Sequence, residues 1–357
     1  MAPGALSRLA PPPRVVDWSI FAAVGFELAS GLLSLTVGTP DGAWVFDLHA
    51  VVGFAIVALL GWKFRRVAAR VRRPSRWDRA TPVSLALAAL AVAALATGGY
   101  WALSGPVRIA GWPLLFVHAV LGVLVAPVLL WHLRNRFRAP AAREFRDRRT
   151  ALRYGALLGA GAVTWRLQRA ATERLSLPGA DRRFTGTKPA EGTGGNDFPV
   201  TNWVADDPDP VDPAGWTLAV GGRVDRSLEL SVGDLDPASS ERALLDCTSG
   251  WYAERAWRGV RVGDLLATAG STDDARWVRF RSVTGYRWSL PIEEAGDALL
   301  ATHVDGEPLS HGHGAPIRLV APGRRGFQWV KWVTAVEVTR RRDVGEWLAI
   351  FVSGLDG

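Results

Sequence analysis

Four long apolar segments dominate the first 140 residues of this chain. They cover residues 15–37, 44–64, 82–103 and 112–133. Each has the roughly 20 residues that an α-helix needs to cross the hydrocarbon core of a bilayer. A succession of such segments is typical of a membrane protein. We therefore predict an all-α four-helix bundle, embedded in a lipid bilayer, in residues 1–140.

The charged residues indicate how these helices are oriented. The chain has 42 Lys and Arg against 34 Asp and Glu, an excess that can indicate nucleic-acid binding. Its arginines, however, gather in residues 65–79 and 134–153, each beside an apolar segment, while residues 191–212 are acidic. Basic loops between membrane helices face the cytoplasm. The pattern argues against nucleic acid as a partner and predicts a multi-pass plasma-membrane protein whose N-terminus is inside.

Two histidines lie at matched depth in the second and fourth segments. His49 follows Trp44 by five residues, and His118 follows Trp112 by six. If both tryptophans mark the outer interface, both imidazoles lie about 8 Å below it at 1.5 Å per residue. Facing imidazoles in a helix bundle suit the iron of a b-type haem, so we predict these two histidines as its axial ligands. A hydrogen-bonded pair of histidines without haem is the alternative.

A third histidine, His132, lies fourteen residues after His118 and therefore on the same helix face. The second segment has no histidine near its inner end to complete a second haem site, so we interpret His132 as an interfacial residue. Residues 12–135 resemble the four-helix haem-b membrane cytochromes that exchange electrons with quinone, such as the cytochrome b561-like group. The resemblance rests on the helix count and the matched histidines, and it implies quinone or quinol as a partner.

Residues 141–195 connect this bundle to the rest of the chain. Residues 147–153, with Arg148, Arg149 and Leu152, resemble a twin-arginine export signal, and a weakly apolar run follows at 154–163. An ordinary basic flank is the alternative, since cytoplasmic flanks are also rich in arginine. In both interpretations residues 151–165 form a fifth transmembrane helix and residues 171–197 a linker. Everything after Gln168 then lies outside the cytoplasm.

Short apolar or alternating runs characterise residues 196–357. Strands are expected at residues 216–220, 228–230, 242–246, 277–282, 317–320 and 332–338, separated by Gly, Pro and Asp turns. Short helices are expected at residues 262–269 and 292–297. This pattern predicts an extracytoplasmic domain of the α+β class.

Cys247 is the only cysteine among the 357 residues. An intrachain disulfide and a metal cluster held by cysteines alone are therefore excluded. The apolar residues 243–245 before it and Gly250 after it predict that the thiol lies at the end of a buried strand that enters a turn. Three roles are open for such a thiol: a nucleophile, a single metal ligand or a buried bystander.

Basic and aromatic residues gather farther along the same domain. His313 and Arg318 stand at opposite ends of a turn into a strand. Residues 326–332 form a loop that opens with glycine and ends in Lys331 and aromatic residues. A phosphorylated heterocyclic cofactor requires such cations for its phosphate, with backbone amides and aromatic side chains around its ring.

The order of these motifs resembles the sulfite oxidase family of molybdopterin enzymes, over residues 195–340. The matching stretches are residues 246–251, 257–260, 263–266, 285–286, 306–309, 313–318 and 330–332. The resemblance implies that Cys247 ligates molybdenum, which suits a soft thiolate. It also implies molybdopterin contacts from His313, Arg318, Lys331, Ser282, Trp329 and Val330, and from a covering segment, residues 196–203, with Asn196, Phe198, Thr201, Asn202 and Trp203.

Two departures from this family bear on the substrate. Sulfite oxidases carry an arginine and a histidine where this chain has Thr201 and Trp203, and a Gly-Asn-Arg-Arg run where residues 250–253 are Gly, Trp, Tyr and Ala. A dianion such as sulfite then lacks its cationic partners, and the nearest basic candidates are Arg255 and Arg258. In these respects the chain is similar to the bacterial reductases of the family, which repair methionine sulfoxide with electrons from a separate haem membrane protein.

We therefore expect a membrane-anchored molybdopterin oxidoreductase that passes electrons from quinol through haem b to molybdenum and reduces a small S-oxide or N-oxide outside the cytoplasm. Asp246 and Tyr252 are candidates for proton handling, with structural roles equally open. Oxidation of a sulfur compound, delivering electrons to the membrane, is one alternative. A non-catalytic electron-transfer or binding module is the other, although the retained Cys247, His313 and Arg318 argue against it.

Overall fold

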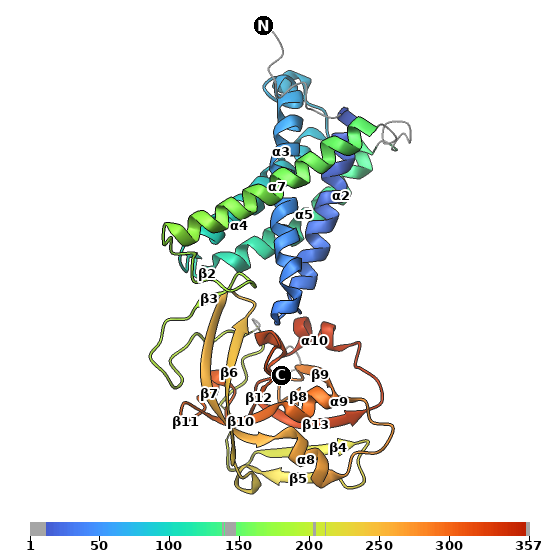
Figure 1. The fold of residues 1–357 in the computed structure, drawn as a ribbon. Coiled ribbons are helices and arrows are strands. Elements are labelled where there is room, and N and C mark those ends of the chain that lie inside the picture. Colours follow the sequence, from blue (N-terminus) through green and yellow to red (C-terminus); the bar gives the residue numbers. More distant parts are fainter. Residues whose placement is uncertain (1–11, 138, 140–147, 203–204, 211, 355–357) are drawn as a thin grey trace. The chain divides into compact units, whose positions relative to one another are not determined.

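The computed structural model describes residues 12–137, 139, 148–202, 205–210 and 212–354, and the chain in it divides into two compact units (Figure 1). The first unit is Met1–Lys188 and the second is Pro189–Gly357. The chain passes from one unit to the other at β3 (Lys188–Pro189), a few residues before the predicted boundary at residue 196. The first unit is helical and the second is rich in strands, as the sequence predicts.

Long helices make up the first unit. They are α2 (Pro13–Ser34), α3 (Ala43–Val71), α4 (Thr81–Leu103), α5 (Leu114–Arg136) and α7 (Arg148–Arg174). Helix α2 packs on α3 and α5, α4 packs on α5, and α7 packs on α3. A short hairpin of β1 (Arg108–Ile109) and β2 (Trp112–Pro113) precedes α5.

Four of these helices are long and apolar enough to cross a membrane: Pro13–Ser34, Pro40–Val71, Thr81–Leu103 and Leu114–Arg136. They correspond to the four predicted apolar segments. Helix α3 continues seven residues beyond the predicted end at residue 64, through the basic stretch 65–71. Arginine and alanine are good helix formers, so the helix persists where the apolar pattern has already ended.

Helix α7 forms where a fifth transmembrane helix is predicted, and it is longer than the predicted 151–165. Its uncharged stretch lies between Arg153 and Arg166 and has 12 residues. At 1.5 Å per residue this stretch spans about 18 Å, against a hydrocarbon core of about 30 Å. Within the described residues α7 is not among the helices that are apolar enough to span, so a crossing by α7 stays a prediction.

Two sheets form the second unit. The first has the order β5-β4-β13-β8-β9, in which only the β4–β13 pair is parallel. In the second, β10 pairs with β7, β11 and β12, and β6 pairs with β7, all antiparallel. The strands are β4 (Thr217–Gly222), β5 (Leu228–Ser231), β6 (Ser239–Cys247), β7 (Trp251–Arg261), β8 (Trp277–Ser282), β9 (Arg287–Pro291), β10 (Leu299–Val304), β11 (Glu307–Pro308), β12 (Arg318–Val320) and β13 (Val333–Thr339).

Three helices complete this unit: α8 (Val262–Ala269), α9 (Ile292–Asp297) and α10 (Glu346–Val352). The six predicted strands and both predicted helices are confirmed, within a few residues. The sequence pattern missed β7, β9 and β10. Strand β7 carries charged residues between its apolar ones because one of its faces is exposed, and such a strand lacks the continuous apolar run of a buried one.

One apolar core joins the two sheets. It contains Trp257 of β7, Phe280 of β8, Leu299 of β10 and Val336 of β13, none of which exposes any surface. Because both sheets contribute to a single core, residues far apart in the sequence are held at fixed positions relative to one another. The candidate site described below depends on this.

We expect Leu299→Ala to lower the free energy of unfolding of the second unit by about 2–5 kcal/mol, because the deletion leaves a cavity in a fully buried position. The matched control is Leu348→Ala on α10, where the side chain is 63% exposed. The control should change stability by less than about 0.5 kcal/mol. Denaturant unfolding followed by hydrogen exchange of β10 amides checks both variants, and equal losses would contradict the position of the core.

Candidate functional site

Cys247 is the last residue of β6, directly before the turn to β7. Its side chain is 7% exposed, and its Sγ lies 3.1 Å from the Ser249 hydroxyl oxygen. The predicted position, at the end of a buried strand that enters a turn, is therefore confirmed. In the register of the hairpin Cys247 lies opposite Trp251, so these two side chains share one face of the sheet.

Asp246 and Tyr252 lie on the other face of this hairpin. They are register partners of one another, and side chains of successive strand residues point to opposite faces. Asp246 forms a buried ion pair with Arg325, whose Nη1 is 3.5 Å from Oδ2. Alternation along the strand turns both side chains to the face opposite the thiol, and Asp246 has a structural partner, which favours the structural alternative. The proton-handling role of Asp246 and Tyr252 stays a prediction.

Arg318 brings a positive charge into the core of this unit. Its side chain is 2% exposed, and its guanidinium lies over the rings of Trp257 and Trp329, 5.1 and 5.8 Å from their centroids. Nη1 donates a hydrogen bond to the backbone oxygen of His313 at 3.0 Å. Burial lowers the pKa of Arg318 to about 10, and the neighbouring Cys247 thiol acts in the opposite direction.

Lys331 adds a second cation close by. Its Nζ donates to the backbone oxygens of Gly312 at 2.6 Å and Thr201 at 3.3 Å, and to the side-chain oxygen of Asn202. Burial, reinforced by repulsion from Arg318, lowers the pKa of Lys331 to about 7. Among the described residues no carboxylate forms an ion pair with either cation.

His313 is held as a neutral imidazole. Its Nε2 lies 3.0 Å from the backbone oxygen of Phe198, and its Nδ1 lies 2.7 Å from the Ser310 hydroxyl. A carbonyl oxygen only accepts, so the proton is assigned to Nε2 and Nδ1 accepts from the hydroxyl. Burial, with a further contribution from Arg318, lowers the pKa of His313 to about 4.

Gly314 makes the turn that connects these groups. Its φ of +104° lies in the left-handed region, which favours glycine. A Cβ at this position would lie 3.0 Å from Cβ of Lys331 and 3.1 Å from Cβ of Arg318. Only glycine therefore allows the chain to leave His313 and enter β12 while both cations stay in place.

The covering segment, residues 196–203, is described as far as Asn202, so Trp203 lies outside the described residues. The ring of Phe198 lies on that of His313, with centroids 3.9 Å apart. The hydroxyl of Thr201 accepts from the indole of Trp251 at 3.2 Å. The segment thus joins the two parts of the sequence-predicted site, the thiol hairpin and the His313–Lys331 region.

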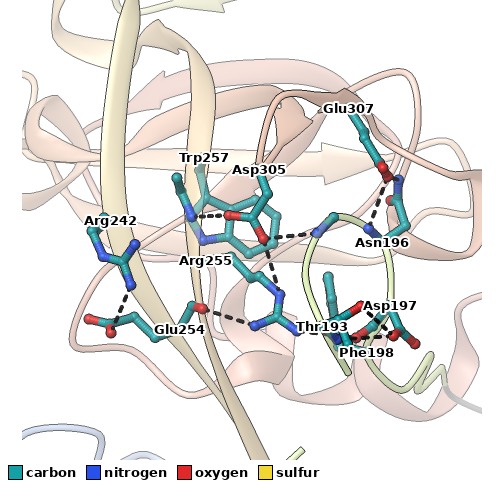
Figure 2. A network of polar contacts seen from close by, with 12 residues as sticks. Thr193, Asn196, Asp197, Phe198, Arg242, Glu254, Arg255, Trp257, Asp305 and Glu307 are labelled. Atoms are coloured by element: carbon teal, nitrogen blue, oxygen red, sulfur yellow. Dashed lines mark hydrogen bonds and ion pairs between the residues drawn. The ribbon is translucent and has the colours of Figure 1, made fainter. Parts of the chain in front are cut away.

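Asp305 ties the start of this segment to the sheet (Figure 2). Its Oδ2 accepts from the backbone nitrogen of Gly195 at 2.9 Å, and its Oδ1 accepts from that of Ala256 at 2.8 Å. Arg255 lies with Nε 3.4 Å from Asp305 Oδ2 and donates from Nη2 to the backbone oxygen of Asp197 at 3.1 Å. Arg255 is therefore engaged in holding the covering segment.

Asn196 also has a positioning role in the structure. Its side chain accepts from the backbone nitrogen of Ser310 at 2.8 Å and donates to the backbone oxygen of Pro308 at 2.9 Å. These hydrogen bonds occupy the side-chain amide of Asn196, which the sequence analysis predicts to contact the cofactor. Asn196 connects the covering segment to the turn that carries His313.

The remaining sequence-predicted residues are buried near these groups. The Ser282 hydroxyl accepts from the backbone nitrogen of Thr284 at 3.3 Å. The backbone oxygen of Val330 accepts from the backbone nitrogen of Leu319, the residue after Arg318, at 2.7 Å. Trp329 lies beneath the guanidinium of Arg318. The cofactor contacts predicted for Ser282, Trp329 and Val330 stay predictions.

Sequence reasoning did not single out Ser249, Trp251 or Asp305 as site residues. Ser249 lies next to the thiol, and Trp251 lies on the thiol's face of the hairpin. Ser249 and Trp251 could have been identified from the sequence because they follow Cys247 by only two and four residues. Asp305 has no such signal, because strand pairing alone brings it to the covering segment.

The cluster fits an anionic cofactor held beside a metal. Arg318 is buried and Lys331 is partly buried, and among the described residues neither forms an ion pair with a carboxylate, although Asp206 and Asp207 act on Lys331 at longer range. No hydrogen bond of Nε of Arg318 occurs there. Buried charge is costly unless an opposite charge offsets it. A phosphate supplies that charge, and the Cys247 thiolate is a soft metal ligand.

The helical unit brings His49 and His118 together. Their ring centroids are 6.1 Å apart. Nδ1 of His49 lies 2.9 Å from both the Ser30 hydroxyl and a carboxylate oxygen of Glu27, and Nδ1 of His118 lies 2.9 Å from the backbone oxygen of Ala94. With Nδ1 engaged in both rings, Nε2 is the nitrogen through which each imidazole would bind the predicted haem iron.

His132 lies apart from this pair. Its Nδ1 is 3.1 Å from the Ser84 hydroxyl. Fourteen residues of helix separate it from His118, which corresponds to about 21 Å at 1.5 Å per residue. Its placement agrees with the interpretation of His132 as a residue outside the haem pair, and the haem itself stays a prediction.

Comparison with known proteins concerns the second unit. Residues 205–347 match the family described as "Oxidoreductase molybdopterin binding domain". An uncharacterized oxidoreductase, YuiH, of Bacillus subtilis is 32% identical over 155 residues, which cover 42% of this chain and 78% of that protein. The protein-methionine-sulfoxide reductase catalytic subunit MsrP of Xanthomonas axonopodis pv. citri is 34% identical over 152 residues, which cover 37% of this chain and 47% of that protein.

The chain thus spans about half the length of this methionine-sulfoxide reductase subunit. Among solved structures, the sulfane dehydrogenase SoxCD of Paracoccus pantotrophus is similar, with 27% identity, a coverage of 38% of this chain and 40% of that one, and a TM-score of 0.36. That score is too low to support an argument about the fold or the substrate.

The buried imidazole makes the stability of the cofactor-free chain depend on pH. Because the pKa of His313 falls from 6.5 to about 4 in the folded state, the unfolded state binds more protons between these two pH values. The contribution of His313 to the free energy of unfolding, about 3 kcal/mol, is therefore fully present above pH 6.5. It is lost as the pH falls from 6.5 through 4. Denaturant unfolding of the cofactor-free protein between pH 4 and 6.5 checks this, and His313→Gln should flatten the dependence; an equally steep curve for the variant would contradict it.

Proposed function

Because the chain belongs to the oxidoreductase molybdopterin-binding domain family, we propose that this oxidoreductase reduces a small S-oxide or N-oxide at a molybdenum centre held by Cys247. One observation carries the proposal. A single buried thiol lies beside two basic side chains, Arg318 and Lys331, where its attraction opposes the burial that lowers the pKa of both. This arrangement supports a metal ligand beside a phosphate site.

Each residue of the cluster then has a defined task. The Cys247 thiolate would hold molybdenum, which supplies two-electron oxygen-atom transfer when bound. Arg318 and Lys331 neutralise the phosphate of the pterin. Neutral His313 fixes the covering segment without adding a third charge. The hydroxyl of Ser249 donates a hydrogen bond to the thiolate sulfur.

We propose a neutral oxide because the arginines nearest in sequence to Cys247 are not available to bind a charged substrate. Arg255 is engaged by Asp305 and the covering segment, and Arg258 is exposed on the face of β7 that points away from Cys247. Trp251 lies on the thiol's face of the hairpin, and the ring of Phe198 lies against it, with centroids 5.9 Å apart. An apolar wall suits a neutral oxide, which needs no compensating cation. The resemblance to a methionine-sulfoxide reductase subunit supports the same direction.

The source of the electrons is proposed to be membrane quinol. Four helices are apolar enough to span a bilayer, and His49 and His118 have the separation and hydrogen bonding that suit two axial ligands of haem b. Haem b would relay the electrons one at a time. Overall, quinol and sulfoxide give quinone, sulfide and water, so that two electrons and two protons balance. The basic residues 65–79 support a cytoplasmic location for that loop. With the helical unit in the plasma membrane, the second unit then lies on the extracytoplasmic side.

We expect the purified chain to reduce methionine sulfoxide with a reduced viologen dye, and Cys247→Ser to lower this rate at least about a thousandfold because it removes the metal ligand. The fold should survive, since the substitution is nearly isosteric. Ser240→Ala, an exposed position of the same strand, is the control and should keep the wild-type rate. Steady-state assays and molybdenum analysis measure both variants.

A paired assay with sulfite and an oxidised acceptor tests the direction. Sulfite should be a poor donor. Sulfite turnover at about 10 per second, without reduction of any oxide, would overturn the proposed direction. Full activity of Cys247→Ser would overturn the metal site.

The haem proposal makes its own prediction. His49→Ala and His118→Ala should each abolish the low-spin b-type spectrum, because each removes one axial ligand, whereas His132→Ala should leave most of it. Reduced-minus-oxidised spectra of the three purified variants, with haem content by extraction, measure this. Equal losses in all three would contradict a single haem between His49 and His118.

A further inference from the structure

A groove of about 320 Å³ lies between α2, α3 and α7 in the helical unit, and neither the molybdenum site nor the proposed haem uses it. Its walls are apolar. They include Ala22 and Phe26 of α2, Ala55 and Leu59 of α3, and Leu158 of α7. A cavity of this size falls at the lower end of the range found for sites that bind small organic molecules.

The close approach of α7 to α3 sets the end of this groove. A Cβ on Gly161 would lie 2.6 Å from the backbone oxygen of Val51, so only glycine allows the two backbones to meet there. Leu157 and Leu158, one turn earlier on α7, line the groove. The groove therefore opens on the N-terminal side of this crossing, along the part of α7 that follows its arginines.

Two hydroxyl groups give the groove one polar end. Ser19 and Tyr154 are the only polar side chains among the described residues that line it, and they form a short hydrogen bond with one another. The Ser19 hydroxyl also donates to the backbone oxygen of Val15 at 2.6 Å. With that proton committed, the Tyr154 hydroxyl donates its own proton to the Ser19 oxygen or to the backbone oxygen of Val15, 3.2 Å away, and its lone pair is left to accept from a ligand.

We propose that this groove binds the head group of the membrane quinol, with Tyr154 at one of its oxygens. The inference rests on the proposed function, because it assigns a place to the quinol of that reaction. A quinol presents hydroxyl donors, and the lone pair of the Tyr154 oxygen can accept one of them. The apolar walls suit a flat ring with a hydrocarbon tail.

The position of the groove agrees with this occupant. Val52 lines it and lies three residues after His49 on α3, so the groove begins within one helical turn of the proposed haem ligand. Two residues before Ser19, Asp17 forms ion pairs with Lys63 and Arg66, at 3.0 and 2.6 Å. These ionisable groups lie near the polar end, where oxidation of a quinol releases its two protons. A lipid acyl chain, the competing occupant, has no use for the hydroxyl pair.

The test compares two electron donors in the full chain reconstituted into lipid nanodiscs. Duroquinol has to use the groove, whereas reduced viologen dye delivers electrons without it, and both are measured by reduction of methionine sulfoxide. Tyr154→Phe should raise KM for duroquinol about tenfold, because it removes one hydrogen bond to the head group. Ala22→Phe should fill the groove and lower the duroquinol-driven rate at least tenfold. Dye-driven reduction should stay at the wild-type rate in both.

Matched controls lie on α4, which does not line the groove. Tyr100→Phe and Ala89→Phe make the same substitutions at exposed positions and should leave duroquinol kinetics unchanged. The unchanged dye-driven rate shows that each variant is folded.

Three results would overturn the proposal, and they differ in what else they affect. If the wild type oxidises duroquinol and both groove variants keep its KM, the groove is wrong and the proposed function stands. If Ala22→Phe loses a copurifying phospholipid, detected by mass spectrometry, while duroquinol kinetics stay unchanged, the occupant is an acyl chain. If the wild type uses the dye but not duroquinol, the quinol link of the proposed function fails and the groove assignment fails with it.

Discussion

Arg318 and Lys331 bring two basic side chains into the second unit, Arg318 fully buried and Lys331 partly, and among the described residues neither forms an ion pair with a carboxylate. Asp206 and Asp207 offset the charge of Lys331 only in part, because its pKa is still lowered. Such burial costs several kcal/mol per ion unless an opposite charge is present. The lowered pKa of each side chain expresses this cost. A fold that keeps both cations beside a single thiol is organised for an anionic ligand that brings the missing charge.

The surrounding structure holds this arrangement without adding further charge to it. His313 is kept neutral by its two hydrogen bonds and its burial, which avoids a third cation. The covering segment rests on that imidazole through Phe198 and is tied to the sheet by Asp305 and Arg255. Arg255 is thereby engaged in holding the covering segment.

The helical unit also holds polar side chains in an apolar surrounding. Each imidazole of the pair His49 and His118 hydrogen-bonds to a neighbouring helix through Nδ1, and the partners of His49 include the Glu27 carboxylate. The hydroxyls of Ser19 and Tyr154 do the same at the polar end of the groove. In both places an apolar wall carries a small number of oriented polar atoms, which is the form of a site for a flat, largely apolar molecule.

The sequence by itself determined which parts of the chain are helical and apolar, where most strands of the second unit lie, and that Cys247 ends a buried strand. These features depend on local patterns: apolar length, alternation and turn residues. The motif order also identified His313, Arg318 and Lys331, because the resemblance places these residues around one cofactor.

Only the tertiary structure decided what each polar side chain faces. Strand register turned Asp246 and Tyr252 away from the thiol and put Trp251 beside it, since neighbouring strand residues point to opposite faces. Pairing of β10 with β7 brought Asp305 to the covering segment and so engaged Arg255. The crossing of α7 over α3 at Gly161 created the groove. Each of these depends on contacts between residues far apart in the chain, which no local pattern records.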